Sequence, residues 1–530
     1  MPYFARYFFA LGIFLTLTPA WAQDAFVHGR LLDAQTEEPV VFATIRIKGK
    51  AIGVISNQDG GFRIPKRFEA EGDSLIISSM GYESRQVSLA QLFQSPLNLI
   101  LLTPRIIQLE EVLLEEKRKN RRKLSARRIV RNAIKAIGEN YPVTPFSAIG
   151  YYRDYQFVDG AYLNLNEAIL EVFDSGFDTV DDLETNVSLY YKNQNTDFER
   201  DTVADNKYGD HTASKKYISN AHLSDYGGNE FTILRIHDAI RNYNINAFDF
   251  VNKFEKNLIK NHALRKERDT YTEEEVLYTI RMSKSVPGYQ VAGRLYISKR
   301  DFAIHKMQYA VYETSGQGAK DPSSEKNRLL FEVVTEYKRE DEKMYLNYIS
   351  FHNDFQLIEP PGFVVDAVVL VFSCECFEVR FNENIDPNTA GDLANYDFSF
   401  KGNKIAFNEV VVYPKAVRLF PKVGAKTFNT MVKEVSAHNN DPNRLPSAFR
   451  TAIGGVLDEV REQLVNEDKH REIQQFREFF VQKLTIGKTT GSASPTYMDK
   501  NRPIFEDQPV SQPEGAADYW INTPLQKVPE

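Results

Sequence analysis

The chain has 530 residues, too many for a single hydrophobic core, so roughly three domains are expected. Its hydrophobic content of 42% with 26% charged residues is that of an ordinary folded protein. The net charge of −7 argues against a protein that binds nucleic acid, which would need a basic surface. The 27 Tyr and 36 Phe favour much β-structure, because aromatic side chains suit the half-buried surface of a sheet.

Residues 1–22 have the pattern of a secretory signal peptide. Arg6 precedes a short apolar core, and an Ala-x-Ala site predicts cleavage between Ala22 and Gln23. The apolar core is shorter than the roughly 20 residues that span a bilayer. No cysteine follows it to accept a lipid. The sequence therefore predicts an exported protein that is located in the periplasm, at the outer membrane or at the cell surface.

Residues 24–104 show short strand patterns separated by turn residues, which predicts a β-sandwich. Within this region, the stretch GVISNQDGGFRI places Asn57 and Asp59 where they could turn the chain or bind calcium. A calcium loop needs further acids at fixed spacing, and none follows before Glu69. The stretch is therefore interpreted as a turn, because Asn, Asp and Gly tolerate left-handed backbone angles.

The same region resembles a known family. The segments VHGRLLDAQTEEPVVFATIRIKGKAIGVISNQDGGFRI and LIISSMGYESRQV are similar to the carboxypeptidase regulatory-like domain, with its Pro39–Ala43 step and its Gly81-Tyr82 pair. The resemblance implies a transthyretin-like sandwich of the kind common in envelope proteins of Bacteroidota-type bacteria. It also implies a domain that often leads TonB-dependent transporters and has no catalytic residues of its own.

Residues 105–145 are interpreted as a basic linker followed by a helix. The run at 117–131 holds nine basic residues and no acidic one, so peripheral docking to anionic lipid or lipopolysaccharide is one interpretation. The favoured interpretation is a solvated linker that leads into a helix capped by Ser125. The apolar stripe of this helix would consist of Ile129, Ala133, Ile134 and Ile137.

Residues 146–361 predict an antiparallel β-meander or half-barrel, with a helical insertion at NAFDFVNKFEKNLIKNHAL. The pattern AGRLYISKRDFAIHKMQY is similar to the sheets of lipoprotein-carrier-like half-barrels. In the hairpin IGYYRDYQFVDGAYLNLNEAILE, burial of the apolar faces favours a three-residue loop over a two-residue turn. That register places Arg153 opposite Glu167 inside an apolar face. Because a lone buried charge is costly, a structural ion pair between Arg153 and Glu167 is expected.

Residues 362–440 predict a second sandwich. The segments FEVRFNENIDPNTAGDLANYDFSF and VVVYPKAVRLFP are similar to bacterial Ig-like domains, and the sandwich turn is favoured over an EF-hand loop. Cys374 and Cys376 stand two residues apart, where a disulfide would be strained and a zinc site would lack its other ligands. They are interpreted as reduced or unpaired small residues of a sheet.

Residues 441–486 have apolar spacing typical of helices, so C-terminal helices are expected there. Residues 487–530 hold many prolines and few periodic apolar positions, which indicates an extended strap. Its anchors would be the aromatic residues Tyr497, Phe505, Tyr519 and Trp520. The fold class is therefore mainly β with helical segments (α+β).

Recognisable catalytic and metal-binding motifs are missing from the sequence. The nine histidines stand in neither H-x-x-E nor H-E-x-x-H, and no G-x-S-x-G or complete phosphate loop occurs. We therefore expect no catalytic residue, no metal and no cofactor.

Three functional hypotheses follow. The favoured one is a non-enzymatic cell-envelope protein that serves binding or assembly, with an envelope protein or a surface polymer as its partner and no nucleic acid. The alternatives are a hydrolase of peptides or glycans without a recognisable motif, and a lipid or lipopeptide carrier built on the middle sheet. A carrier would need a large apolar cavity, and a hydrolase would need clustered acids or a nucleophile beside a base.

Overall fold

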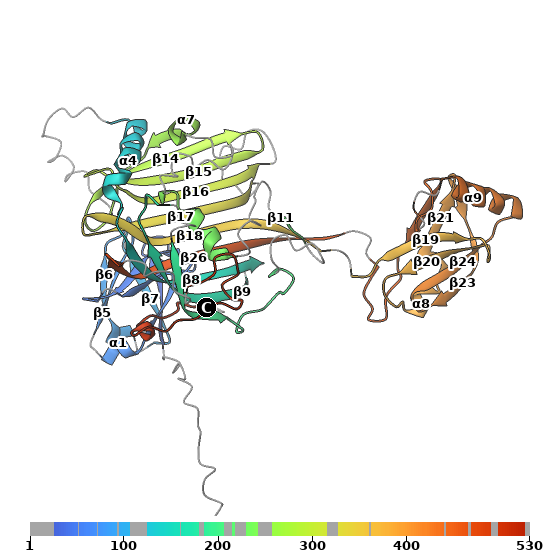
Figure 1. The fold of residues 1–530 in the computed structure, drawn as a ribbon, viewed down its shortest axis with the longest axis horizontal. Coiled ribbons are helices and arrows are strands. Elements are labelled where there is room, and N and C mark those ends of the chain that lie inside the picture. The colour runs from blue at the N-terminus through green and yellow to red at the C-terminus, as the bar shows by residue number, and fades with distance from the viewer. Residues whose placement is uncertain are drawn as a thin grey trace, which may run out of the picture. The chain divides into compact units, whose positions relative to one another are not determined.

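A computed structural model describes most of the chain. The chain divides into two compact units (Figure 1). We call the first unit, residues 1–208, 218–355 and 473–530, the body, and the second, residues 209–217 and 356–472, the inserted domain. The described residues are 26–50, 52–70, 73–92, 95–105, 124–158, 161–179, 185–205, 215–217, 229–241, 257–314, 327–359, 362–438, 441, 443–464, 468–488 and 497–524.

The body begins with a two-sheet sandwich, as the sequence predicts. One sheet has the order β4-β1-β7 and the other the order β3-β2-β5-β6. Alternating residues of these strands point into one core, which Trp520 from the far end of the chain completes. The elements are β1 (Phe26–Asp33), β2 (Thr44–Ile47), β3 (Gly53–Ile55), β4 (Gly61–Pro65), α1 (Arg67–Ala70), β5 (Ser74–Ser78), β6 (Arg85–Ser88), α2 (Leu89–Leu92) and β7 (Leu97–Leu102).

The other strands of the body belong to a twelve-stranded sheet, with a path of β10-β9-β8-β26-β18-β17-β16-β15-β14-β12 (Figure 1). Off this path, β11 pairs with β18 and β13 pairs with β14. The strands are β8 (Phe146–Val158), β9 (Ala161–Asp174), β10 (Asn186–Gln194), β11 (Lys215–Tyr217), β12 (Ala263–Lys266), β13 (Thr270–Tyr271), β14 (Val276–Val286), β15 (Tyr289–Ser298), β16 (Ile304–Thr314), β17 (Asn327–Glu340), β18 (Lys343–Glu359) and β26 (Lys469–Ile486).

The helices α4 (Ala126–Asn140), α6 (Glu230–Ile236) and α7 (Leu258–Asn261) share one apolar core with this sheet. Ser125 caps α4 by accepting a hydrogen bond from the Arg128 amide. Its buried stripe includes Ile129 and Ile137. A second apolar cluster joins Tyr151 and Phe480 to residues of the N-terminal sandwich and of the C-terminal segment. The central strands are therefore covered by side chains on both faces.

The expected helix over 441–486 is wrong in its main part, because β26 is a strand between β8 and β18. Phe476, Phe479 and Phe480 have helical spacing in the sequence. In the sheet, however, Phe479 packs in the cluster that contains the helices, and Phe480 packs in the opposite cluster. A central strand that is buried on both faces loses the alternation that identifies a strand from its sequence.

The β8–β9 hairpin corrects the expected three-residue loop. Val158 pairs with Ala161, so two residues connect the strands. The register then shifts at a β-bulge, after which Asp154 pairs with Asn166. Asn164 lies in the bulge with a φ of 51°, a left-handed conformation that Asn tolerates better than most residues. Burial thus selects the register through a bulge instead of through a longer loop.

The inserted domain contains two sheets around one core, with orders β19-β20-β24-β23 and β22-β21-β25. It extends past the expected boundary at residue 440, since β25 pairs with β21. The elements are β19 (Val365–Val371), β20 (Cys376–Phe381), α8 (Pro387–Ala390), η3 (Leu393–Asn395), β21 (Tyr396–Phe400), β22 (Asn403–Ile405), β23 (Phe407–Tyr413), β24 (Ala416–Pro421), α9 (Ala425–His438) and β25 (Phe449–Ile453).

Cys374 and Cys376 form a disulfide, so the expected unpaired cysteines are wrong. The two residues do not lie on one straight strand, because Cys374 belongs to the turn that precedes β20. Glu375 between them has a φ of 51°. The Cα atoms are 5.2 Å apart, within the range that a disulfide spans.

The C-terminal segment 497–524 runs over the body with little regular structure besides η4 (Ala516–Asp518). Tyr497 and Val510 form bridges with β10. Trp520 enters the core of the N-terminal sandwich, and its indole nitrogen donates to the Arg63 carbonyl over 2.9 Å. Tyr519 packs in the apolar cluster that contains Tyr151 and Phe480. We call this segment the strap.

Some expectations fall on residues that the structure does not describe. They are the signal peptide 1–22 with its cleavage site, the first half of the basic run 117–131, and most of the predicted helical insertion. Among the described helices, none combines the length and the apolar composition that a membrane-spanning helix requires.

The position of β26 leads to a test at Gly150. A Cβ atom there would lie 2.5 Å from the Phe480 carbonyl oxygen and 2.7 Å from the Phe479 ring. We expect Gly150→Ala to lower the free energy of unfolding by about 1–3 kcal/mol, because a packed sheet cannot absorb the methyl group. Gly454→Ala, where nothing lies within 4 Å, should change it by less than about 0.5 kcal/mol. Equal stability of the two variants in denaturant titrations would contradict the β8–β26 pairing.

Candidate functional site

A buried ion pair lies where β8, β26 and the N-terminal sandwich meet. Arg153 on β8 is opposite Glu478 on β26 in the strand register, and both side chains are 0% exposed. The Arg153 Nε donates to a carboxylate oxygen of Glu478. The Nη1 donates to the Asn57 side-chain oxygen over 2.6 Å. We call these residues, together with Glu167 and Asn522, the ionic junction.

Aromatic rings surround the Arg153 guanidinium. The rings of Tyr151, Tyr155 and Phe480 have their centroids 5.8, 5.4 and 5.3 Å from its central carbon. Burial lowers the pKa of Arg153, but the Glu478 carboxylate and the nearby tyrosines more than offset this effect and hold it well above its usual value. The guanidinium therefore stays charged, and the structure around it must satisfy that charge.

Glu167 does not supply the counter-charge that the sequence analysis expected. It is the cross-strand neighbour of Arg153 and is fully buried, but the carboxylate that contacts the guanidinium is that of Glu478. Glu167 instead accepts hydrogen bonds from Tyr151 over 2.6 Å, from Thr523 over 2.8 Å and from Asn195 over 2.9 Å. The expected ion pair was wrong because the strand that carries Glu478 was interpreted as a helix.

The turn at Asn57 does more than reverse the chain. Its backbone is a turn, with the Gly60 amide bonded to the Asn57 carbonyl over 2.9 Å and a φ of 75° at Gly60. The Asn57 side chain, only 2% exposed, enters the ionic junction and also accepts from Asn522 of the strap over 3.2 Å. Asn522 in turn donates to the Ile55 carbonyl over 2.9 Å. Sequence analysis identified the turn but had no signal for this side-chain role.

A second polar cluster lies on the other face of the sheet. Arg477, fully buried, contacts the Glu230 carboxylate of α6 and donates to Asn353 over 2.6 Å. Nearby, Tyr152 and Asn166 each donate a hydrogen bond of 2.8 Å to the Asp154 carboxyl group. Burial, followed by the charge of Glu230, raises the pKa of Asp154 to about 7. This cluster attaches α6 to the sheet.

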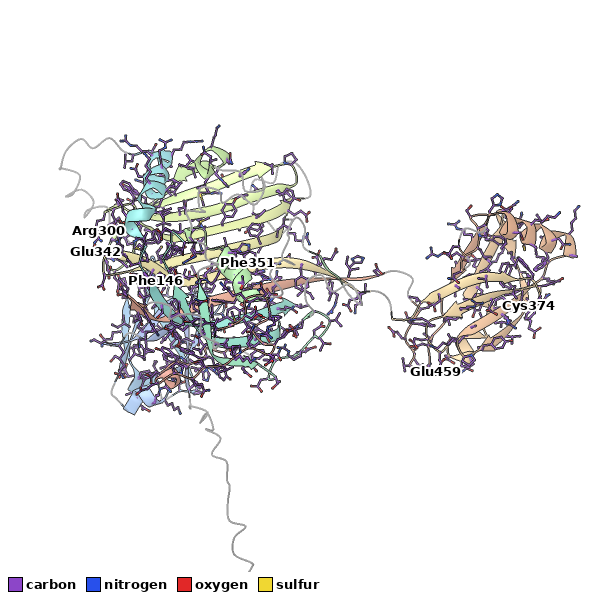
Figure 2. All side chains as sticks on the ribbon, viewed as in Figure 1. Phe146, Arg300, Glu342, Phe351, Cys374 and Glu459 are labelled. Carbon is purple, nitrogen blue, oxygen red and sulfur yellow. A yellow bond between two sulfur atoms is a disulfide. The ribbon has the colours of Figure 1, made fainter. Side chains whose placement is uncertain are left out.

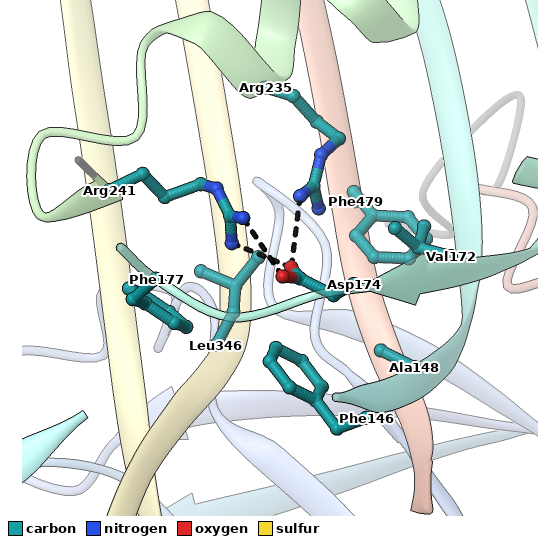
Figure 3. Close-up of a pocket in the computed structure, with 9 residues that line it drawn as sticks. All are labelled: Phe146, Ala148, Val172, Asp174, Phe177, Arg235, Arg241, Leu346 and Phe479. Carbon is teal, nitrogen blue, oxygen red and sulfur yellow. Dashed lines mark hydrogen bonds and ion pairs between the residues drawn. The ribbon is translucent and has the colours of Figure 1, made fainter. Parts of the chain in front are cut away.

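Figure 3 shows a third cluster around a small cavity. Arg241 binds the Asp174 carboxylate with two hydrogen bonds of 2.6 and 2.9 Å, and Arg235 approaches the same carboxylate at 3.3 Å. The cavity has a volume of about 10 Å³, which is room for about one water molecule. The apolar residues around it are Phe146, Ala148, Val172, Phe177, Leu346 and Phe479.

A much larger concave surface lies in the inserted domain. It is an open groove of about 610 Å³ beside β19 and β20. Tyr413 is 41% exposed, and the side chains of Arg380 and Lys415 are 51% and 54% exposed. The groove therefore offers an aromatic ring and two exposed cations, although Arg380 also contacts Glu378 over 2.8 Å and Lys415 lies 3.7 Å from Glu383. Its lining residues are Asp366, Ala367, Arg380, Phe381, Tyr413, Lys415, Ala416 and Asn443.

The described residues contain no group of three or more His, Cys, Asp or Glu side chains that could hold a metal ion. Among the described residues, a histidine, a serine and an arginine, the side-chain types of many catalytic sites, surround the carboxylate of Glu275. His305 lies 2.9 Å from its carboxylate and Ser298 donates to the same carboxylate, with Arg339 at 3.4 Å. His305 and Ser298 thus both face the acid, which is the geometry of a structural network and not of a serine activated by a histidine.

Comparisons with known proteins agree with the N-terminal fold. Residues 27–114 match the family model described as CarboxypepD_reg-like domain, which confirms the resemblance of the N-terminal region. A stretch of 79 residues is 35% identical to the TonB-dependent receptor SusC of Bacteroides thetaiotaomicron. This match covers 15% of the chain and 7% of that receptor. It supports a protein of the Bacteroidota type, although the chain spans only a small fraction of the receptor's length.

Solved structures match the chain at low scores. A LolA superfamily protein from Nitrosomonas europaea is 12% identical with a TM-score of 0.18, over 43% of this chain and 86% of that one. A DUF1329 family protein from Desulfovibrio piger is 9% identical with a TM-score of 0.20, over 43% and 86%. Scores of this size define no common fold.

The ionic junction leads to a stability test. We expect Arg153→Met to lower the free energy of unfolding by about 3–5 kcal/mol, because it leaves the Glu478 carboxylate buried without its partner. The double variant Arg153→Met with Glu478→Met should lose less than the sum of the single variants, since it buries no charge. Denaturant titrations of the four proteins measure this coupling.

A matched control is the exposed ion pair between Arg300 and Glu342, which is 2.8 Å long; both residues are labelled in Figure 2. Its side chains are 52% and 81% exposed, so Glu342→Gln should cost less than about 0.5 kcal/mol. A loss for Arg153→Met no larger than that of this control, or strict additivity in the double variant, would refute the account of the ionic junction.

The raised pKa of Asp154 predicts a pH dependence. Between its ordinary value of 3.8 and about 7, the folded protein holds a proton on Asp154 that the unfolded chain releases. The contribution of Asp154 to the free energy of unfolding is therefore largest at low pH. It decreases as the pH rises, with a slope of at most about 1.4 kcal/mol per pH unit. The stability of the parent relative to Asp154→Asn should fall from pH 4 to 7 and level off above about pH 8. A flat or rising difference in denaturant titrations would contradict the burial of this carboxyl.

Proposed function

We propose that the protein is an exported cell-envelope protein that works by binding a partner, and that the inserted domain is its binding module. The observation that carries the proposal is the groove of about 610 Å³ on a separately folded domain. This domain connects β18 to β26, which are neighbours in the sheet of the body. Such an insertion adds a recognition surface without interrupting the sheet.

The buried charged groups of the body support a structural role, because they bind other side chains of the protein. Arg153, Arg477 and Asp174 are all buried and bound to protein side chains. The helices α4 and α6 pack on the apolar sheet face that a lipid carrier would leave open. These contacts favour binding by the inserted domain over chemistry or transport inside the body.

The comparisons support the location. The carboxypeptidase regulatory-like match and the short match to SusC, a TonB-dependent receptor by name, favour the cell envelope of a Bacteroidota-type bacterium. The partner is an envelope protein or a surface polymer. The accessible Arg380 and Lys415 in the groove favour an acidic segment of that partner.

The groove can be tested by site-specific photo-crosslinking in cells that produce the protein. A photoreactive amino acid in place of Tyr413 should give one discrete adduct in the envelope fraction. The same probe in place of Val460, which is 82% exposed and does not line the groove, should not give that adduct.

The charge of the groove supplies the second comparison. Arg380→Glu together with Lys415→Glu should lower the yield of the adduct at position 413 several-fold, since the two introduced carboxylates would repel an acidic segment. Identical products from positions 413 and 460, or an adduct that is indifferent to the charge reversal, would refute binding by the groove.

Export is tested separately. The protein purified from the envelope fraction should have the mass of a chain that begins at Gln23.

A further inference from the structure

The disulfide of the inserted domain lies at the exposed end of a hairpin (Figure 2). It connects Cys374, in the turn after β19, to Cys376, the first residue of β20. Cys376 pairs with Val371 in the strand register. Only one residue, Glu375, separates the two cysteines, so the covalent loop is about as short as a disulfide loop can be.

Such a short loop contributes little to the stability of the fold. The stabilisation that a disulfide provides through chain entropy grows with the number of residues it encloses. The hairpin is also held by six residue pairs between β19 and β20, and Leu370 and Phe377 anchor it in the core of the domain. The disulfide can therefore open and close while the domain stays folded.

The two cysteine residues differ in exposure. Cys376 is 0% exposed, whereas Cys374 is partly exposed. An attacking thiolate must approach the sulfur that it will bind, so the more exposed Cys374 is the better target in the folded protein. Beside it, Phe372 is 48% exposed and offers an apolar contact for a peptide.

We propose that Cys374 and Cys376 form a thiol–disulfide exchange site that oxidises cysteine pairs of polypeptides. A substrate thiolate attacks the Sγ of Cys374, a substrate–Cys374 disulfide forms, the Cys374–Cys376 bond breaks, and Cys376 leaves as a thiolate. The second substrate thiolate then attacks the substrate sulfur of the mixed disulfide, and Cys374 leaves as a thiolate. The substrate loses two electrons and the cysteine pair gains them, while the two protons of the substrate thiols neutralise the two cysteine thiolates.

The roles of the two sulfurs can be separated because the chain has only these 2 cysteines. In the full chain, Cys376→Ser leaves the accessible thiol and Cys374→Ser leaves the buried one. With glutathione disulfide, Cys376→Ser should form the mixed disulfide at least tenfold faster, as measured by alkylation and intact mass. Equal rates, or a faster reaction of Cys374→Ser, would overturn the assignment of Cys374 as the attacked sulfur.

The exchange itself is tested with the oxidised parent protein and a reduced synthetic peptide that carries two cysteines and an apolar residue. One peptide disulfide should form for each chain, and neither serine variant should form it. A peptide that stays reduced with the folded protein but is oxidised once the protein is denatured would show a purely structural disulfide and overturn the proposal. Circular dichroism and the unfolding midpoint verify that all variants are folded.

Phe372→Ala tests the contact beside the pair. In the oxidised protein it should slow exchange with the reduced apolar peptide several-fold and leave the reaction with reduced glutathione unchanged. Equal slowing of both reactions would contradict a role of Phe372 in peptide binding. This proposal does not depend on the groove, since the cysteines are not among its lining residues.

Discussion

The buried charge of Arg153 is the constraint on which the body depends. A guanidinium cannot lose its proton in a protein, so a fully buried arginine requires a carboxylate and further acceptors around it. Glu478 and Asn57 supply them in this chain, and Asn522 bonds to Asn57 from the strap. These groups come from the middle of the chain, its N-terminal domain and its C-terminal region, so the three regions must assemble together to satisfy one charge.

The N-terminal sandwich was predictable because its strands obey local rules. The strands β1, β2 and β5 alternate between buried and half-buried positions, and turn residues separate the strands. The same rules failed for β26, since both of its faces are buried. The partner of Arg153 could then not be predicted, because Glu478 is 325 positions away in the chain. Spacing of two between Phe476, Glu478 and Phe480 was the signal that could have indicated a strand.

The hairpin of β8 and β9 shows what burial can predict and what it cannot. Burial required the faces of Arg153 and Glu167 to coincide, and the structure places these residues opposite each other. Burial did not specify how the chain achieves that register. A bulge at Asn164 and a longer loop satisfy the same hydrophobic demand, and only local backbone preferences distinguish them.

The two units place their polar groups differently. The body uses its polar groups internally, at the ionic junction, at Arg477 and at Asp174, and these groups fix the sandwich, the helices and the strap on the sheet. The inserted domain presents its groove and the partly exposed Cys374 at its surface.

Native-state hydrogen exchange tests this account most directly, because it reports which segments open together. The amides of Asn57 and Gly60 in the turn should exchange in the same slow step as β8 and β26, since the ionic junction unites them. Amides of β20 and β24 in the inserted domain should exchange in a separate step, because that domain has its own core. Exchange of the Asn57 turn well before β8 and β26 would contradict the account, because the N-terminal sandwich would then open independently of the buried charge.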